Sequence, residues 1–248
     1  MAKRIAIVTG GMGGIGQAIC RVLHDQDIHV IATYNRGGNH AAAQSWQNEQ
    51  QKAGYHFDIA YVDVTDFQSC QNMVNQVQEK TGPIDILVNN AGITRDSSCC
   101  KMNREDWDIV INTDLNSVFY VTRATINSMK ERKYGRIINI SSINGQKGQF
   151  GQVNYSAAKA GMHGFTKALA LEVAKKGITV NTISPGYVAT DMIMSVPDDI
   201  RNKILGEIPM GRFANPDEVA HVVAFLVDDK SSYITGTNIA INGGHYML

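Results

Sequence analysis

Tyr155 and Lys159 are separated by three residues in a segment of helical periodicity. On a helix this spacing puts the phenol and the ammonium on one face, one turn apart. An ordinary phenol has a pKa of about 10 and exchanges protons poorly near neutral pH until a nearby cation stabilises its charged form. The pair is therefore a candidate proton donor. The same spacing also occurs in surface pairs, so the assignment depends on the other motifs.

Ser141 and Ser142 end an apolar run thirteen residues before the tyrosine. The run predicts a β-strand, and open α/β sheets bind their ligands at the carboxyl ends of the strands. We therefore expect Ser142 to hydrogen-bond a substrate carbonyl within reach of Tyr155 and Lys159.

A glycine-rich segment, Thr9–Gly16, follows the first predicted strand and begins a helix. Glycines permit a tight turn and the close approach of a phosphate, and the helix N-terminus offers backbone amides to it. The GxxxGxG spacing alone would also fit an ordinary strand-to-helix turn. With the later motifs, it predicts a dinucleotide site that includes Gly10, Met12, Gly13, Gly14, Ile15 and Gly16.

Tyr34, Asn35 and Arg36 stand where the second predicted strand ends. Folds that bind NAD usually carry an acidic residue there for the ribose hydroxyls. Arg36 could instead pair with a 2′-phosphate, and Asn35 could donate a hydrogen bond to it. The sequence therefore predicts NADPH rather than NADH, with a solvated surface arginine as the alternative for Arg36.

Runs rich in Ile and Val alternate with segments of helical periodicity along the chain. Continuous apolar runs are typical of parallel strands that are covered on both faces. We therefore predict an α/β fold over residues 1–248: a single Rossmann-type domain with a doubly wound parallel sheet of about seven strands and helices on both faces. The predicted strands are Arg4–Thr9, His29–Thr33, Ile59–Val64, Ile84–Asn89, Arg136–Ser141, Ile178–Ile183 and Asn238–Asn242.

The longest predicted helices are Arg104–Lys133 and Gln152–Lys176, each of which is followed by a glycine and a strand. Between Pro185 and Pro216 the alternation of strands and helices is lost. A long loop within a compact domain is often a lid, and we predict a substrate lid at about residues 187–212.

The composition argues against several classes of function. Basic and acidic residues both total 23, and no basic block suggests nucleic-acid binding. Without a signal peptide or a membrane-spanning apolar run, we expect a cytoplasmic protein that binds no membrane. The scattered histidines lack zinc-site spacing, so we expect no catalytic metal. The four cysteines lack CxxC spacing and should be reduced; a redox pair at Cys99 and Cys100 is the alternative, although a disulfide between neighbours is strained.

The glycine pattern, the segment Asn89–Gly92, Ser142, Tyr155 and Lys159 together resemble the short-chain dehydrogenase/reductase family over nearly the whole chain. The resemblance implies that a hydride from the nicotinamide attacks a carbonyl carbon while Tyr155 protonates the oxygen. It implies that Ser142 holds this oxygen and that Lys159 binds the ribose. Asp114 stands where the family usually has a catalytic asparagine. An aspartate could still accept hydrogen bonds there while adding a charge near Lys159.

The resemblance also implies cofactor contacts beyond the glycine-rich segment. Asp63 and Val64 would flank the adenine, although a solvated strand-end acid fits Asp63 equally well. The remaining implied cofactor contacts are Asn90, Ala91, Gly92, Ile93, Thr94, Pro185, Gly186, Tyr187 and Val188.

Three segments, Gly10–Gly16, Ile93–Asp96 and Asn144–Gln152, are similar to those of family members that reduce acetoacetyl-CoA in bacterial polyhydroxybutyrate synthesis. This implies reduction of an acyl-CoA thioester, acetoacetyl-CoA, to (R)-3-hydroxybutanoyl-CoA with NADPH. The implied substrate contacts are Asp96, Ser142, Gln149, Phe150, Gly151, Gln152 and Tyr187.

Other interpretations remain open for the substrate. The thioester could be carried by acyl carrier protein, docked by the basic cluster Lys130, Arg132 and Lys133, although these residues also suit a solvated helix C-terminus. The chain could also be an inactive nucleotide-sensing protein. In this family the two long helices pair across subunits, which implies a homotetramer, although their apolar stripes could equally face only the sheet.

Overall fold

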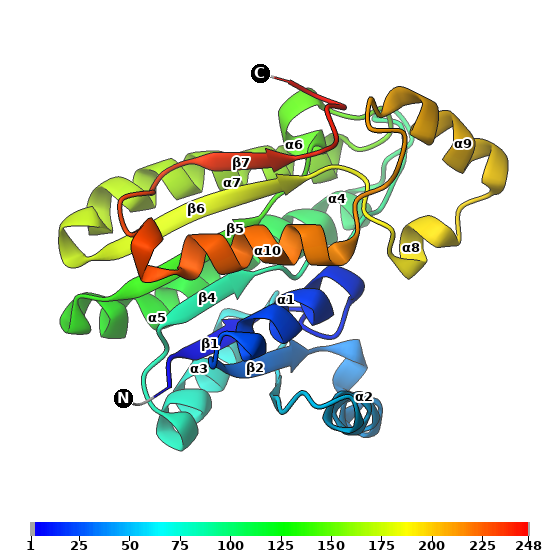
Figure 1. Ribbon diagram of the computed structural model, residues 1–248. Helices are drawn as coiled ribbons and strands as arrows, with labels where there is room; N and C mark the ends of the chain where they lie inside the picture. The colour runs from blue at the N-terminus through cyan, green and yellow to red at the C-terminus, as the bar shows by residue number, and fades with distance from the viewer. Residues whose placement is uncertain (1–2, 248) are drawn as a thin grey trace.

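The computed structural model describes residues 3–247, except for the side chains of Arg36 and Met192. Seven parallel strands form one sheet in the order β3-β2-β1-β4-β5-β6-β7 (Figure 1). The strands are β1 (Ile5–Val8), β2 (His29–Tyr34), β3 (Asp58–Tyr61), β4 (Ile86–Asn89), β5 (Gly135–Ile140), β6 (Ile178–Pro185) and β7 (Asn238–Ile241). Each predicted strand overlaps one of these, and the predicted fold class is confirmed. The strand order reverses between β1 and β4, which is where doubly wound sheets bind ligands.

Helices cover both faces of the sheet. The α-helices are α1 (Gly14–Asp25), α2 (His40–Lys52), α3 (Phe67–Thr81), α4 (Arg104–Ile111), α5 (Ser117–Arg132), α6 (Asn144–Lys147), α7 (Val153–Val173), α8 (Asp191–Met194), α9 (Asp198–Glu207) and α10 (Pro216–Val227). Four further helical segments are η1 (Arg36–Gly38), η2 (Asn112–Asn116), η3 (Ala174–Lys176) and η4 (Asp229–Ser231). Figure 1 shows α1 and α10 in front of the sheet.

The strands contribute side chains to two apolar cores, one on each face of the sheet, because successive side chains point to opposite faces. Ala6 and Val8 of β1 belong to the core under α1 and α10, whereas Ile5 and Ile7 belong to the core under α3, α5 and α7. Each fully buried large apolar side chain contributes about 1.5–3 kcal/mol. Burial on both faces explains why the strands are continuous apolar runs.

The predicted helix Arg104–Lys133 is observed as α4, η2 and α5, which follow one another without a break. A π-helical segment, η2, separates α4 from α5, and Asp114 lies within it. A π-helical segment widens the helix locally and is frequent at functional sites. Here it coincides with a buried carboxylate that bonds outside its own helix. The predicted helix Gln152–Lys176 is observed as α7 followed by η3.

The segment predicted as an irregular lid contains two helices, α8 and α9, and the expectation of a structureless loop was therefore wrong. Asp198 and Asp199 lie in the first turn of α9, where acidic side chains stabilise a helix dipole. Both helices lie beyond the carboxyl ends of the strands in Figure 1. The role of this segment as a lid stays a prediction.

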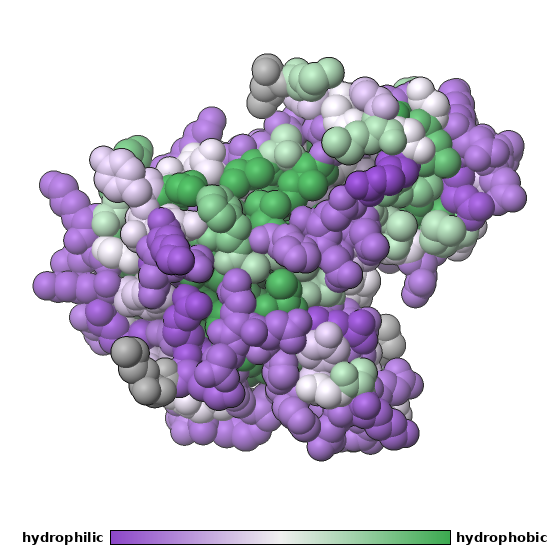
Figure 2. All heavy atoms as spheres, viewed as in Figure 1, coloured by the Kyte–Doolittle hydropathy of each residue, from purple (hydrophilic) through white to green (hydrophobic). Residues whose placement is uncertain are grey.

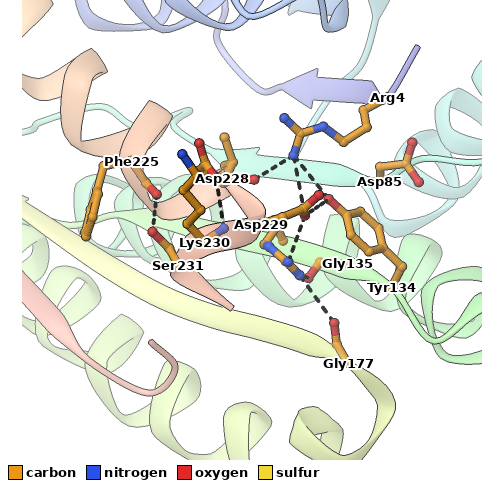
Figure 3. A network of polar contacts seen from close by, with 12 residues as sticks. Arg4, Asp85, Tyr134, Gly135, Gly177, Phe225, Asp228, Asp229, Lys230 and Ser231 are labelled. Carbon is orange, nitrogen blue, oxygen red and sulfur yellow. Dashed lines mark hydrogen bonds and ion pairs between the residues drawn. The ribbon is translucent and has the colours of Figure 1, made fainter. Parts of the chain in front are cut away.

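A polar network ties distant segments together at the amino edge of the sheet (Figure 3). Arg4 donates hydrogen bonds to the carbonyl of Val227 at 2.7 Å and to the Tyr134 hydroxyl at 3.1 Å. Tyr134 in turn donates to Asp229 at 2.9 Å. A groove of about 780 Å³ lies at this edge, but most of its charged groups pair with one another, and no residue predicted for catalysis or for cofactor or substrate binding lines it. The candidate site is at the opposite edge.

None of the helices in the described part of the chain combines the length and the apolar character needed to cross a bilayer.

Candidate active site

A cleft of about 560 Å³ opens at the carboxyl edge of the sheet, around the point where the strand order reverses. It brings together most residues that the sequence predicts for cofactor binding and catalysis. The predicted residues that line it are Gly10, Met12, Gly13, Gly14, Ile15, Gly16, Asn35, Asn90, Ala91, Gly92, Ile93, Thr94, Ser142, Tyr155, Lys159, Pro185 and Gly186.

The cleft also has lining residues that sequence reasoning did not assign to the site. They are Thr33, Tyr34, Ile140, Ser141, Thr190 and Asp191. The strand-end rule could have found the first four, because they lie at or beside the carboxyl ends of β2 and β5. Thr190 and Asp191 belong to the lid segment, and no motif marks them.

The glycine-rich turn has the geometry of a phosphate cradle. Gly10 has a φ of 61°, and a Cβ on Gly16 would overlap the carbonyl oxygen of Gly10. Helix α1 begins at Gly14 without a side-chain cap, so its first amides face the cleft with no side-chain acceptor. Uncapped amides and the helix dipole attract an anion, and the residues present fit a dinucleotide pyrophosphate.

Asn90 fixes this turn to the end of β4. Its side-chain amide donates to the carbonyls of Thr9 at 3.0 Å and Gly10 at 3.2 Å. The Thr9 hydroxyl oxygen accepts hydrogen bonds from the backbone amides of Asn90 at 2.9 Å and Ala91 at 3.0 Å. Thr9, which the sequence marks only as the start of the turn, therefore helps to hold the cofactor side of the cleft.

Lys159 projects from α7 into the floor of the cleft and is only 3% exposed. Its ammonium lies 5.4 Å from the ring centre of Tyr155 and donates a 3.0 Å hydrogen bond to the carbonyl of Ile140. Burial alone would lower the pKa of Lys159, but the charges of Asp114 and Tyr155 outweigh it and raise that pKa. Lys159 therefore keeps its positive charge beside the phenol.

Asp114 is fully buried in the π-helical segment η2. Its Oδ1 accepts a 2.9 Å hydrogen bond from the backbone amide of Ile93, and its Oδ2 lies 3.3 Å from the Lys159 ammonium. Burial raises the pKa of Asp114, against the lowering effects of Lys159 and the Ile93 amide. A Cβ on Gly92 would meet both members of the pair, so glycine is required there.

Ser142 is nearly buried beside the cleft. Its hydroxyl oxygen accepts a 3.1 Å hydrogen bond from the backbone amide of Asn144. In the described part of the chain its hydrogen is not committed to another group, so the hydroxyl can donate to a ligand oxygen.

Most of the residues predicted to bind substrate form a second group next to the start of α7. Asp96 accepts a 2.8 Å hydrogen bond from the Gln152 amide, and the carbonyl of Gly151 accepts one from the Ser97 amide. The side chain of Phe150 is 91% exposed, and Gln149 accepts a 3.4 Å hydrogen bond from Lys147. The segment is therefore tied to the loop that carries Asp96 while its phenyl ring faces solvent.

Several predicted site residues do not line the cleft. Asp63 accepts hydrogen bonds from the amide and hydroxyl of Thr65, and Val64 and Val188 are buried in the apolar cores. Tyr187 lines a neighbouring cavity of about 310 Å³. Burial, followed by the charges of Glu207 and Asp96, raises the pKa of Tyr187. The predicted contact of the Arg36 side chain with a 2′-phosphate lies outside the described residues.

The cysteines are free thiols, as predicted. Cys20 and Cys70 are buried, whereas Cys99 and Cys100 are exposed. Burial, together with two nearby aspartates, raises the pKa of Cys70 to about 12. Within residues 3–247, no three His, Cys, Asp or Glu side chains come together as metal ligands would.

A phosphate-binding turn at the switch point of a doubly wound sheet, with a tyrosine and a buried lysine beside it, is the arrangement of an oxidoreductase that uses a nicotinamide cofactor. Residues 10–246 match a family model described as enoyl-(acyl carrier protein) reductase. The chain belongs to the short-chain dehydrogenase/reductase family.

Similar proteins match over almost the whole chain. An acetoacetyl-CoA reductase of Allochromatium vinosum is 54% identical over 98% of this chain and 99% of its own length. An acetoacetyl-CoA reductase of Cupriavidus necator is 49% identical over the full length of both chains. The 3-oxoacyl-[acyl-carrier-protein] reductase FabG of Vibrio harveyi is 42% identical over 99% of this chain and 98% of its own length.

Proposed function

We propose that this protein reduces acetoacetyl-CoA to (R)-3-hydroxybutanoyl-CoA with NADPH, as a cytoplasmic step of poly-3-hydroxybutyrate synthesis. The observation that carries the proposal is the placement of Ser142, Tyr155 and Lys159 on one cleft together with the phosphate-binding turn. The names and the high identity of the relatives from A. vinosum and C. necator support the choice of substrate.

The side chains supply binding and proton transfer. When bound, NADPH supplies the hydride that the carbonyl carbon accepts. The Ser142 hydroxyl donates a hydrogen bond to the carbonyl oxygen, and Tyr155 delivers a proton to that oxygen as negative charge develops on it. The Lys159 ammonium stabilises the phenolate that remains, and Asp114 keeps this ammonium charged.

The preference for NADPH follows from the end of β2. Asn35 lines the cleft where an acidic residue would repel a 2′-phosphate, and no acidic residue directly follows it. We expect kcat/KM to be at least about tenfold higher with NADPH than with NADH, which corresponds to about 1.4 kcal/mol. Equal kcat/KM values with the two cofactors would contradict the roles proposed for Asn35 and Arg36 in binding the 2′-phosphate.

We expect the exposed ring of Phe150 to limit the length of the acyl chain that the enzyme accepts. It lies on the segment tied to Asp96, yet packs against little of the protein itself. The variant Phe150→Ala should fold normally and reduce longer 3-oxoacyl-CoA esters better relative to acetoacetyl-CoA. An unchanged chain-length preference would contradict this role.

A carrier-bound thioester is the second candidate substrate, favoured by the similarity to the V. harveyi reductase. The basic cluster considered for carrier docking does not support it. Arg132 binds Asp85 and the carbonyl of Ile84 at the amino edge of the sheet, opposite the cleft. The intact catalytic residues likewise argue against an inactive nucleotide-sensing protein.

Exposed apolar side chains on the long helices support a homotetramer. Phe119 on α5 is 49% exposed, Leu171 on α7 is 85% exposed, and Trp107 on α4 is also exposed. Figure 2 shows further apolar atoms gathered over β6 and β7, above α10 in the view. Covering such surfaces releases water and stabilises an assembly. Light scattering of the wild type and of Leu171→Glu tests this, with a monomeric wild type as the contrary result.

The decisive experiment follows NADPH oxidation by the purified protein with acetoacetyl-CoA and, separately, with acetoacetyl-acyl carrier protein. Rapid turnover of the CoA ester and formation of the R product would support the proposal. Turnover of the carrier-bound ester alone would move the protein to fatty-acid synthesis. Tyr155→Phe, which keeps the ring but removes the hydroxyl, is the matched inactive control.

A further inference from the structure

His163 lies one helical turn beyond Lys159 on α7 and reaches two strand ends at once. Its Nε2 is 3.0 Å from the hydroxyl of Ser141, which follows β5, and 3.3 Å from the hydroxyl of Ser184 in β6. One ring nitrogen therefore connects three elements. The sequence shows only an isolated histidine, and no motif marks it as part of the site.

The neighbouring hydrogen bonds decide the direction of these contacts. Ser141 donates its hydroxyl hydrogen to the carbonyl of Lys159 at 2.8 Å, and Ser184 donates its own to the Asn238 side chain at 2.7 Å. A hydroxyl has one hydrogen, so each oxygen can only accept from the imidazole. The Nε2 of His163 must therefore carry a hydrogen and share it between the two serines.

Each of the three connected segments carries a part of the proposed site. Ser141 directly precedes Ser142, and Ser184 directly precedes Pro185, which lines the cleft. The third contact, through Ser141, ends on the main chain of Lys159 itself. A shift of about 1 Å in any of these parts relative to the others could cost about a hundredfold in rate.

We propose that His163 is a positioning residue which, as its Nε2–H tautomer, holds the segments of Ser142, Lys159 and Pro185 in register for hydride and proton transfer. The inference rests on the proposed function for its kinetic part. Its structural part, the tautomer and the two hydrogen bonds, is independent of the substrate.

The charge state of His163 fits this role. Burial, followed by the charge of Lys167 on the next turn of α7, lowers the pKa of His163. The groups that face its Nε2 from β5 and β6 are the uncharged hydroxyls of Ser141 and Ser184. His163 is therefore neutral at pH 7, and the neutral ring already carries the one N–H that these hydrogen bonds need.

Two substitutions separate positioning from simple packing. His163→Met fills a similar space without a donor, whereas His163→Gln offers an amide N–H at a similar reach. We expect His163→Met to lower kcat by about tenfold to a hundredfold, with KM for NADPH and for the thioester changed less than about twofold. His163→Gln should recover most of the loss, and Lys175→Met, at an exposed position in η3 just after the same helix, should behave as the wild type.

The kinetic measurement uses whichever 3-oxoacyl thioester the wild type reduces. Wild-type kcat in His163→Met would overturn the positioning role. Equal losses in the methionine and glutamine variants, accompanied by equal losses of thermal stability, would also overturn it, because a packing role would then suffice.

Nitrogen-15 NMR of histidine-labelled protein tests the hydrogen bonds without substrate or cofactor, with His163→Gln identifying the resonance. A neutral ring protonated at Nε2 is expected at pH 7, and a ring protonated at Nδ1 would overturn the inference. If the wild type oxidised NADPH with neither thioester, the proposed function would fail while the NMR result would still decide the tautomer.

Discussion

The substitution Asp114→Asn should lower the pH at which the enzyme loses activity on the alkaline side, so that the loss falls within the pH range of an ordinary assay. The buried Asp114 carboxylate lies 3.3 Å from the Lys159 ammonium. At an effective dielectric constant of about 20, unit charges at this distance attract by about 5 kcal/mol. This is an upper limit, because the asparagine carbonyl keeps part of the attraction and the backbone contact with Ile93.

Since about 1.4 kcal/mol corresponds to one pH unit, we expect the alkaline limb of kcat/KM to move down by roughly one to three pH units. The sign follows from the ion pair. In the wild type the pKa of Lys159 is raised, so its charge stabilises the fold below its ordinary pKa and is lost only at higher pH. Without the Asp114 charge, less negative charge opposes the effect of burial, so the pKa of Lys159 falls and the ammonium loses its proton at a lower pH. The variant should therefore also be less stable than the wild type near pH 7.

The assay is NADPH oxidation with acetoacetyl-CoA from about pH 6 to about pH 10, followed for wild type and variant in parallel. Asp108→Asn is the matched control, because it removes the same charge from a partly exposed residue of α4 that pairs with Arg104. An alkaline limb in Asp114→Asn that coincides with those of the wild type and the control would refute the reasoning. Thermal unfolding at each pH shows whether the proteins remain folded.

Three further predictions concern stability and accessibility. A Cβ at Gly16 would overlap the backbone of the glycine-rich turn, so Gly16→Ala should lower the unfolding free energy by about 1–3 kcal/mol in urea titrations, whereas Gly206→Ala, in open space on α9, should not. Hydrogen bonds from the Arg212 guanidinium and the Asn215 backbone amide lower the pKa of Glu218 from its ordinary 4.5 to about 2. The ionised carboxylate therefore stabilises the fold above pH 4.5, and this stabilisation is lost as the pH falls towards about 2. Glu218→Gln should therefore unfold at lower urea than the wild type at pH 7, and the difference should shrink in acid; a difference that is constant with pH would contradict this. A thiol reagent should label Cys99 and Cys100 in the folded protein and all four cysteines after denaturation, and rapid labelling of a third thiol in the native state would be the contrary result.

The sheet and the catalytic pair could be predicted because their signals are local. Each strand is a short apolar run, and Tyr155 and Lys159 lie within one turn of a helix. The position of Ser142 followed from the rule that ligands bind at strand ends. For these features, neighbours in the sequence are also neighbours in space.

The π-helical segment around Asp114 could not be predicted, since its cause lies elsewhere in the chain. Its carboxylate bonds to Ile93 and Lys159, which are far from it in sequence. Helix periodicity on either side gives no sign of these contacts.

Helix α9 was missed for a different reason. Pro197 and Pro209 flank it, and none of its residues is buried, so no apolar stripe distinguishes it from a polar loop. The contacts of His163 were equally invisible, because both of its partners are serines at the ends of separate strands.

The amino-edge network of Figure 3 bears on how the chain reaches this structure. Arg4 stands just before the interior strand β1 but bonds to the carbonyl of Val227, 223 positions later. The partner of β1 on one side, β4, is also far along the chain. Closing such long loops costs entropy before any contact repays it, and folding that depends on distant contacts is slow. One edge of β1 can pair early with β2, which follows it closely in the chain, but the other edge must wait for β4, and the Arg4 contact must wait for α10. Until β4 has been synthesised, the open edge of this apolar strand is exposed to wrong contacts.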